Sequence, residues 1–282
     1  NMSSYRHEWD EKYIRPYSTN IRQIKYMERL IGLKPTDYEH PSDKAALDKL
    51  RSNTAFRTLM TEFIHHGVER IYRIQYTGSC LKIDKSDYPE IYQVLENAGN
   101  TLGVKKLPDL YMQYDYFINA FTTGEKQPLM VLYSGVIDLL EEEEQQYIIG
   151  HELGHIMSSH VLYHMMVNGL VDLIDLGPLN AAIELPLYYW SRMSELTADR
   201  AGLLACQDIN AAIRAMIKMA GLPQAQYDKI NVQAFIDQAH DFNEKNTGFL
   251  DETFKFISIA NSTHPWLVLR AAELLKWVES GE

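Results

Sequence analysis

The sequence predicts a mostly helical α+β protein. Three observations support this class. Helical periodicity dominates the first eighty residues, residues that favour β-structure gather in one central stretch, and almost everything from Glu141 onward is again helical in pattern. Helices, then a small sheet, then helices is the order typical of α+β proteins.

Residues 1–80 are predicted to form a helical extension. A basic helical stretch, "IRQIKYMERLIG", is followed by "HPSDKAALDKLRSNTAFRTLMTEFIHHGVERIYRIQ", which has strong helical periodicity. Ser42 or Asp43 is expected to cap the first of these helices, because short polar side chains accept hydrogen bonds from free backbone N–H groups. This extension is expected to support a core of residues 81–282 or to serve as a partner-binding arm.

The centre of the chain is predicted to form the sheet. The stretch "GSCLKIDKSDYPEIYQVLENAGNTLG" indicates a short strand, a turn and a helix that Gly99 and Gly103 end. The following stretch, "DLYMQYDYFINAFTTGEKQPLMVLYSG", is rich in tyrosine, phenylalanine, isoleucine and valine, with "TTGEKQP" as a turn. We predict two or three strands there.

The remaining chain is predicted to be helical and to contain no membrane span. The charge run Glu141 to Glu144 is expected to be a solvated helix start, where acidic side chains suit the helix dipole. The longest uncharged stretch, Leu153 to Val171, contains three histidines and Asn168. A membrane span needs about 20 predominantly apolar residues.

Composition excludes several classes of protein. The 282 residues carry a net charge of −11 without a dominant basic cluster, which argues against nucleic-acid binding. The two cysteines, Cys80 and Cys206, form no C-x-x-C pattern, so a disulfide scaffold is not expected and a reducing compartment is suitable. The opening stretch is too polar for a secretory signal.

One short motif carries chemistry. His151, Glu152 and His155 form H-E-x-x-H within "IIGHELGHIMSSH". On a helix, the two histidines lie near one face and can bind one metal ion, while Glu152 lies about 100° around the axis, where it can act as a general base on water. The alternative is a buried helix with incidental histidines. Gly150, Gly154 and Ser158 favour the functional interpretation, because glycine inside a helix costs about 1 kcal/mol and needs a packing or functional reason.

A catalytic zinc site needs a third protein ligand. His160 would lie about 140° from the metal face of a continuous helix, so His160 and His164 are expected to be structural or surface residues. Four carboxylates are candidates: Asp172, Asp175, Glu184 and Glu195.

Glu195 is favoured as that ligand. It lies in the strong helical run "WSRMSELTADRAGLLAC", where Ala198 and Gly202 allow close helix approach. Asp199 follows one turn later and is placed to accept the second N–H of a ligand histidine. Asp175 remains the main alternative, although "DLIDLGP" has the pattern of a helix end, and Glu184 precedes Pro186 in a stretch expected to be broken.

With these pieces in order, the sequence resembles the gluzincin metallopeptidases that include the HtpX heat-shock protease and the CAAX prenyl proteases. The matching motifs are "INAF" (Ile118 to Phe121), "HELGH" (His151 to His155), "SELTADRAG" (Ser194 to Gly202) and "THPWLVLR" (Thr263 to Arg270). The resemblance runs from about residue 36 to the end and is strongest to soluble bacterial members. It implies a zincin-like core with a small edge-strand sheet above the active-site helix.

The resemblance also implies roles for individual residues. His151, His155 and Glu195 would bind one Zn²⁺ per chain, with Glu152 as the base and Asp199 orienting a ligand histidine. The substrate would lie as an added strand along Asn119 and Ala120, with Arg270 lining the cleft. His264 would stabilise the transition state or cap the zinc in a latent form.

The expected function is that of a zinc metalloendopeptidase of the bacterial cytoplasm that cleaves extended or unfolded polypeptides in protein quality control. Where membrane members carry membrane helices, this chain has "VLYHMMVNGLVDLIDLGPLNAAIELPLYYW", expected to form packed helices and a lid, or a surface that touches membranes or unfolded protein. The alternative is a latent or non-catalytic zinc module with chaperone-like client binding. A structural zinc protein is the third hypothesis. The sequence does not define the oligomeric state.

Overall fold

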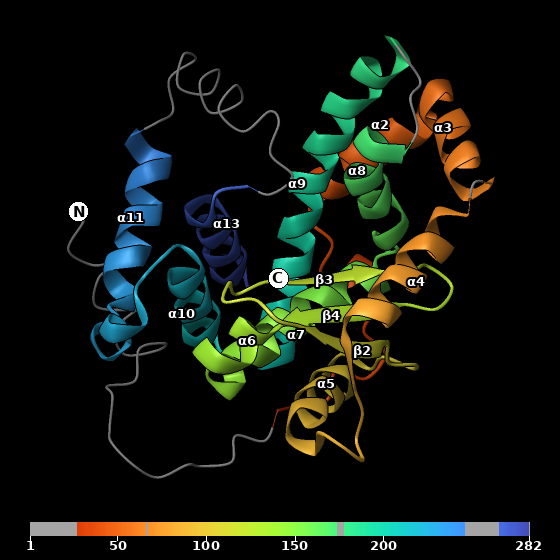
Figure 1. Ribbon diagram of the computed structural model, residues 1–282. Coiled ribbons are helices and arrows are strands. Elements are labelled where there is room, and N and C mark those ends of the chain that lie inside the picture. Colours follow the sequence, from red (N-terminus) through yellow and green to blue (C-terminus); the bar gives the residue numbers. More distant parts are fainter. Residues whose placement is uncertain (1–26, 66, 174–177, 246–264, 282) are drawn as a thin grey trace.

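The computed structural model describes residues 27–65, 67–173, 178–245 and 265–281 (Figure 1). It confirms the predicted α+β class, with helices around one small sheet. Before the sheet, the described residues form four helical elements: η1 (Pro35–Asp37), α2 (Pro41–Ser52), α3 (Thr54–His65) and α4 (Val68–Ser79).

The sheet has four strands in the order β1-β2-β4-β3. These are β1 (Leu81–Ile83), β2 (Asp109–Gln113), β3 (Ala120–Thr123) and β4 (Leu129–Tyr133). The central pair, β2 and β4, is parallel, whereas β1 and β3 pair antiparallel with their neighbours. The short strand and the upper estimate of three further strands are therefore confirmed, and β3 is an edge strand.

Helices cover both faces of this sheet. Leu110 and Met130 belong to a buried apolar cluster with α5 (Pro89–Leu102) and α7 (Glu142–Met157). Tyr111 and Val131, whose side chains point to the opposite face, pack with Tyr76 of α4. Burial on both faces explains why β4 is apolar along its length instead of alternating with polar residues.

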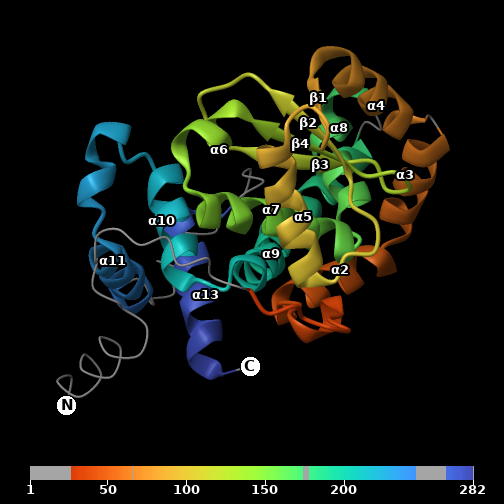
Figure 2. The same ribbon diagram turned by 90° about the horizontal axis from the view of Figure 1, so that it is seen from below.

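The second half of the chain is helical, as predicted. It contains α6 (Ser134–Leu139), α7, α8 (Val161–Leu173), α9 (Pro178–Cys206), α10 (Ile209–Met219), η2 (Gln224–Lys229), α11 (Val232–Lys245) and α13 (Leu267–Ser280). Viewed from below, α5, α7 and α9 lie together under the sheet, and α10, α11 and α13 form a group at one side (Figure 2). None of the helices in the described part of the chain has the length and apolar composition needed to cross a lipid bilayer.

The glycines of α7 allow the closest helix packing in the protein's centre. A Cβ atom at Gly154 would lie 2.5 Å from Cβ of Ala201, and one at Gly150 would meet the side chain of Ala205. A Cβ atom at Gly202 of α9 would in turn lie 2.8 Å from the backbone oxygen of Tyr147. The predicted close approach of these two helices is therefore present, and it places the motif of α7 against α9.

Several local predictions were wrong. The described end of "IRQIKYMERLIG", residues 27–32, is coil and turn instead of helix, and residues 21–26 lie outside the described part of the chain. His40 caps α2, because its Nδ1 accepts from the backbone N–H of Ser42 at 3.2 Å, and Asp43 is instead fully buried.

The run Glu141 to Glu144 does begin a helix, with Glu141 and Glu142 exposed, but Glu144 is fully buried rather than solvated. It forms ion pairs with α10, at 2.6 Å to Lys218 and 3.0 Å to Arg214, because it faces that helix.

A further error concerns α9, which continues through Pro186 instead of breaking there. Ile183, Leu187 and Trp190 are buried in one apolar cluster with residues of α2, α3 and α8. Tertiary packing of this face outweighs the hydrogen bond that proline removes from a helix interior.

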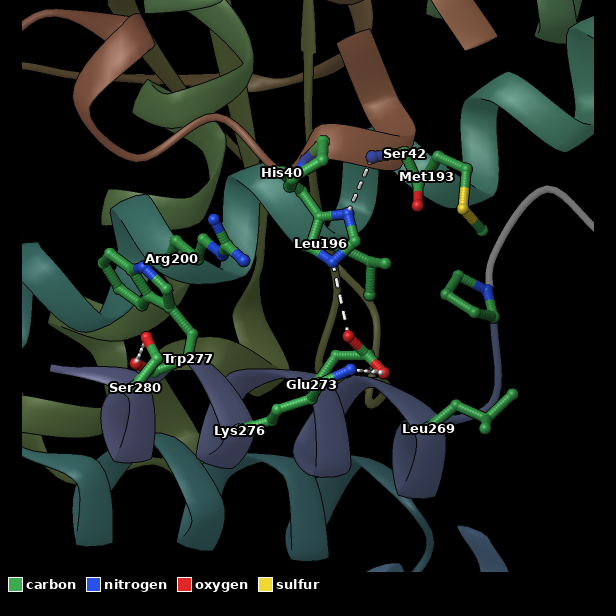
Figure 3. Close-up of a pocket in the computed structure, with 12 residues that line it drawn as sticks. His40, Ser42, Met193, Leu196, Arg200, Leu269, Glu273, Lys276, Trp277 and Ser280 are labelled. Carbon is green, nitrogen blue, oxygen red and sulfur yellow. Dashed lines mark hydrogen bonds and ion pairs between the residues drawn. The ribbon is translucent and has the colours of Figure 1, made fainter. Parts of the chain in front are cut away.

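The start of α2 also contacts α13. His40 Nε2 lies 3.3 Å from a carboxylate oxygen of Glu273, beside a cavity of about 520 Å³ between α2, α9 and α13 (Figure 3). In the same cavity wall, the guanidinium of Arg200 lies 4.9 Å from the ring centre of Trp277. A polar contact thus joins the start of α2 to α13, and a cation–π contact joins α9 to α13.

Candidate metal centre

The H-E-x-x-H motif lies at the floor of a cleft of about 940 Å³. His151, Glu152 and His155 are all buried, with at most 7 % of each residue exposed. The cleft walls come from β3, α4, α8 and the start of α13. A cleft with two histidines and a carboxylate at its base gives a ligand access to a group of polar side chains.

Three side chains converge with the spacing of metal ligands. Nε2 of His151 lies 3.2 Å from Nε2 of His155, and these atoms lie 3.4 and 3.3 Å from the two carboxylate oxygens of Glu195. Ligand atoms bound to tetrahedral zinc at about 2.0–2.1 Å stand about 3.3 Å apart, so these residues fit a zinc ion. The helix of Glu195 can come this close because Gly154 faces Ala198 and Ala201.

Asp199 contacts the other nitrogen of His151. Its Oδ1 lies 3.0 Å from His151 Nδ1 and accepts a hydrogen bond of 2.7 Å from the Tyr147 hydroxyl. Arg270 of α13 donates two hydrogen bonds to the same carboxylate, at 2.6 and 2.8 Å, and lies 3.3 Å from Glu195. A carboxylate on the second nitrogen orients a ligand histidine and selects the tautomer with a lone pair on Nε2.

The charges of this cluster favour a cation. Burial lowers the pKa of His151, but hydrogen bonds to Asp199 and Glu195 outweigh burial and raise this pKa to about 9. Burial raises the pKa of Asp199, but Arg270 outweighs burial and holds it at about 2. The carboxylates of Asp199 and Glu195 thus favour positive charge at His151, and a divalent metal ion between the histidines supplies it.

A second chain of contacts starts from His155. Its Nδ1 lies 3.1 Å from Nδ1 of His160, and Nε2 of His160 lies 3.1 Å from Oδ2 of Asp43 on α2. Asp43 also accepts hydrogen bonds from Thr197 at 2.6 Å and from the Trp190 indole at 3.0 Å. Both His160 and Asp43 are fully buried. Burial raises the pKa of Asp43, but the hydrogen bond with His160 outweighs burial and lowers it.

His160 was predicted to point away from the metal face of α7, because the helix was assumed to continue past it. The structure instead places its buried ring against His155. Helix α7 ends at Met157, and Ser159 adopts a left-handed backbone conformation with φ of 58°. The backbone N–H of His160 then bonds to the oxygen of His155 at 2.9 Å, as in a Schellman turn. This turn brings the His160 ring back against the ligand histidine, and no glycine in the sequence signals it.

Glu152 contacts the edge strand. One of its carboxylate oxygens accepts a hydrogen bond of 2.8 Å from the hydroxyl of Thr122, which the sequence analysis did not identify. Thr122 directly follows "INAF", so its position beside that motif was the available signal. Ala120 begins β3, and Asn119 precedes it, with its backbone oxygen accepting from the N–H of Tyr133 on β4 at 3.0 Å.

The other predicted site residues have mixed outcomes. Arg270 lines the cleft, but it is 5 % exposed and its guanidinium is directed to Asp199 and Glu195. Glu184 lies on α9 outside the converging group. His264, Asp175 and the side chain of Asp172 lie outside the described residues.

Among the described residues, two groups have the proximity of metal ligands. One is His151, His155 and Glu195, and the other is His155, His160 and His164. The second group contains no carboxylate and shares His155, whose Nε2 already faces the first group. The first group therefore suits a divalent cation better.

This fold, with an H-E-x-x-H helix below an edge strand, is typical of metallopeptidases. Residues 85–278 match the family model of peptidase family M48. The chain belongs to this metallopeptidase family, and the resemblance to HtpX and the CAAX prenyl proteases is thereby confirmed.

Curated relatives agree with this assignment. The chain is 29% identical over 257 residues to the plastoglobule-localized metallopeptidase 48 (chloroplastic) of Arabidopsis thaliana, covering 89% of this chain and 74% of the relative. An HtpX protease homologue of Tropheryma whipplei is 31% identical over 97 residues, and one of Halobacterium salinarum is 30% identical over 95 residues. Those two alignments cover 34% and 33% of this chain, and 33% and 32% of the relatives. No solved structure gave a significant match.

Proposed function

We propose that this protein is a zinc-dependent metalloendopeptidase with His151, His155 and Glu195 as the zinc ligands. The observation that supports this most directly is the spacing of 3.2–3.4 Å between their facing nitrogen and oxygen atoms. Glu152 lies on the same helix, next to the first histidine and open to the same cleft. This combination is suited to hydrolysis of a carbonyl compound by an activated water.

Zinc in this site supplies Lewis acidity, which acidifies a water and polarises the scissile carbonyl. The Glu152 carboxylate accepts the proton from the attacking water and then delivers it to the leaving amine. The hydroxyl of Thr122 orients this carboxylate by donating a hydrogen bond to one of its oxygens. His264 is proposed to stabilise the oxyanion, as the family resemblance implies.

The substrates we propose are extended or unfolded polypeptides. One edge of β3 pairs with β4, and in the described part of the chain no strand pairs with its other edge, so a substrate main chain can be added there. Ile71 of α4 and Trp266 at the start of α13 line the same cleft and are 48% and 39% exposed. Recognition of main chain together with apolar walls favours broad sequence preference.

Zinc analysis combined with cleavage of unfolded casein tests this function. Glu152→Gln is expected to reduce cleavage by about 10²- to 10⁴-fold while the zinc content stays unchanged, because the amide no longer accepts a proton. A fully active Glu152→Gln variant would contradict the mechanism.

The ligand assignment has its own control on the same helix. Glu195→Gln is expected to lose zinc, whereas Glu184→Gln, which changes another carboxylate of α9, is expected to retain it. Loss of zinc in Asp175→Asn instead of Glu195→Gln would show that the third ligand is misassigned. A native chain that binds zinc and casein without cleaving would favour the non-catalytic client-binding module.

The location is proposed to be the bacterial cytoplasm. Both cysteines are free, with Cys206 buried and Cys80 half-buried, which suits a reducing compartment. The plant relative is named for a chloroplast, and peripheral contact with a membrane is compatible with the exposed Tyr116 and Phe117. Fractionation of the source cells distinguishes a cytoplasmic from a membrane-associated pool.

A further inference from the structure

The contacts behind His155 have a consequence beyond the proposed ligand set. His155 directs Nε2 toward His151 and Glu195 and directs Nδ1 toward His160. A neutral imidazole carries one proton, so the nitrogen that faces a metal ion must be the one without it. Any group that fixes the proton on Nδ1 therefore prepares His155 for metal binding.

The contacts that lead from Asp43 through His160 to His155 favour one arrangement of protons. The Asp43 carboxylate accepts hydrogen bonds from Thr197 and Trp190, and its remaining contact is with Nε2 of His160 at 3.1 Å. Because a negatively charged carboxylate 3.1 Å away favours the proton on the nitrogen that faces it, we assign the proton of His160 to Nε2 and the lone pair to Nδ1. That lone pair accepts the proton on Nδ1 of His155 at 3.1 Å, which leaves Nε2 of His155 free to bind a cation.

We propose that Asp43 and His160 are positioning residues that hold His155 in its zinc-binding tautomer, so that the zinc affinity of this chain depends on helix α2. Asp43 lies on α2, before the region of residues 85–278 that matches the family model. The proposal rests on the proposed zinc ligands, but it concerns zinc binding and not peptide cleavage. It gives the N-terminal helices a role in the metal centre itself.

Complete burial makes the contacts between Asp43, His160 and His155 specific. His160 and Asp43 are both 0% exposed, so bulk water does not replace either partner when one is removed. The ring of His160 also lies against Trp190, with centroids 5.6 Å apart, which limits its rotation. The first test is therefore the dissociation constant of Zn²⁺ for the full chain, measured by competition with a chromogenic chelator.

Two variants interrupt the series of contacts from Asp43 to His155 at different points. Asp43→Asn adds an amide donor that allows His160 to reverse its tautomer, and His160→Leu removes the acceptor for His155. Each is expected to weaken zinc binding by about 10- to 100-fold, the usual effect of losing a group that orients a metal-bound histidine. His160→Asn places an amide oxygen near the position of Nδ1 and is expected to recover part of this loss.

Thr197→Val is the matched control for a purely structural effect. It removes another buried hydrogen bond to Asp43 while His160 stays in place. We expect it to destabilise the fold but to change the zinc dissociation constant by less than about twofold. Zinc affinities of Asp43→Asn and His160→Leu that match this control would overturn the proposal.

The native chain provides a test that needs no folded variant. Long-range ¹H–¹⁵N correlation spectra of the zinc-loaded protein report the protonated nitrogen of each histidine. We expect the proton of His155 on Nδ1 and that of His160 on Nε2. A proton on Nδ1 of His160 would refute the proposed positioning of His155. If the native protein binds no Zn²⁺ at all, the proposed function fails; if zinc binds tightly but the variants behave like the control, only the positioning role fails.

Discussion

The two ligand histidines of α7 are four residues apart, yet their outer nitrogens meet different parts of the molecule. His151 contacts Asp199 directly, on the same helix that supplies Glu195, and Arg270 holds that carboxylate from α13. His155 reaches its carboxylate, Asp43, only through a second histidine and a helix that precedes the family match. The His151 side thus lies within the family core, and the His155 side depends on the N-terminal helices.

This difference shows how a common motif acquires individual surroundings. On the His151 side, Asp199 of α9 contacts the histidine and forms an ion pair with Arg270 of α13. On the His155 side, among the described residues, Asp43 has no arginine partner and accepts hydrogen bonds from Thr197 and Trp190. Loss of Asp199 should therefore leave the buried charge of Arg270 with fewer partners, whereas loss of Asp43 should mainly change the tautomer of His160.

The largest effect is expected on the His151 side. Asp199→Asn should reduce the free energy of unfolding by about 3–5 kcal/mol, because it leaves the buried Arg270 without its main partner. Zinc affinity should fall by about 10- to 100-fold as well. Chemical denaturation and chelator competition measure the two quantities.

A second variant separates these two consequences. Asp199→Asn combined with Arg270→Met removes the unpaired charge, so stability should recover while zinc affinity stays low. Unchanged stability in the single variant would show that the ion pair contributes nothing, and the contrast between the two histidine sides would disappear.

An intermediate effect is expected where α7 meets α9. Gly154→Ala should destabilise the fold by about 1–3 kcal/mol, because its Cβ would lie 2.5 Å from that of Ala201 and would force apart the helices carrying the ligands. Thermal unfolding of the zinc-free chain measures this change.

Gly78→Ala is the matched control, since Gly78 lies in α4 with nothing within 4 Å of its Cβ position. Alanine there should stabilise by about 0.5–1 kcal/mol, as expected for a helix without crowding. The same sign for both variants would mean that close helix contact does not constrain the ligand geometry.

The smallest effect is expected at the contact between α2 and α13. Glu273→Gln should cost about 0.2–1 kcal/mol at neutral pH, because the carboxylate is partly exposed and its partners are His40 and the exposed Lys276. The hydrogen bond to His40 lowers the pKa of Glu273 below its ordinary value of 4.5. This stabilisation is therefore present above that value and is lost as the pH falls through the lower pKa of the folded state.

Denaturation curves at pH 7 and at about pH 3 test this contact. The native chain and Glu273→Gln should differ at neutral pH and converge in acid. A zinc affinity that remains unchanged in Glu273→Gln would show that Asp43, rather than the general attachment of α2, connects this helix to His155.

Much of the site was predictable because its signals are local. The i, i+4 histidines, the intervening glutamate and the small residues Gly150 and Gly154 follow helical geometry, and the structure places them as expected. The stretch around Glu195 was recognisable for the same reason. Ser42 and Asp43 were misjudged as caps because capping propensity says nothing about a buried partner elsewhere in the fold.

The sequence by itself determined the class of fold, the helix that presents His151, Glu152 and His155, and the family, because periodicity and ordered motifs are properties of neighbouring residues. Only the tertiary structure decided what stands behind the two histidines. The left-handed turn at Ser159 returns His160 to His155, and the packing of α2 on α9 brings Asp43 to His160 from far along the chain. Such contacts depend on the burial of whole helices against one another, and a buried carboxylate then takes the hydrogen-bond partners that this packing places within its reach.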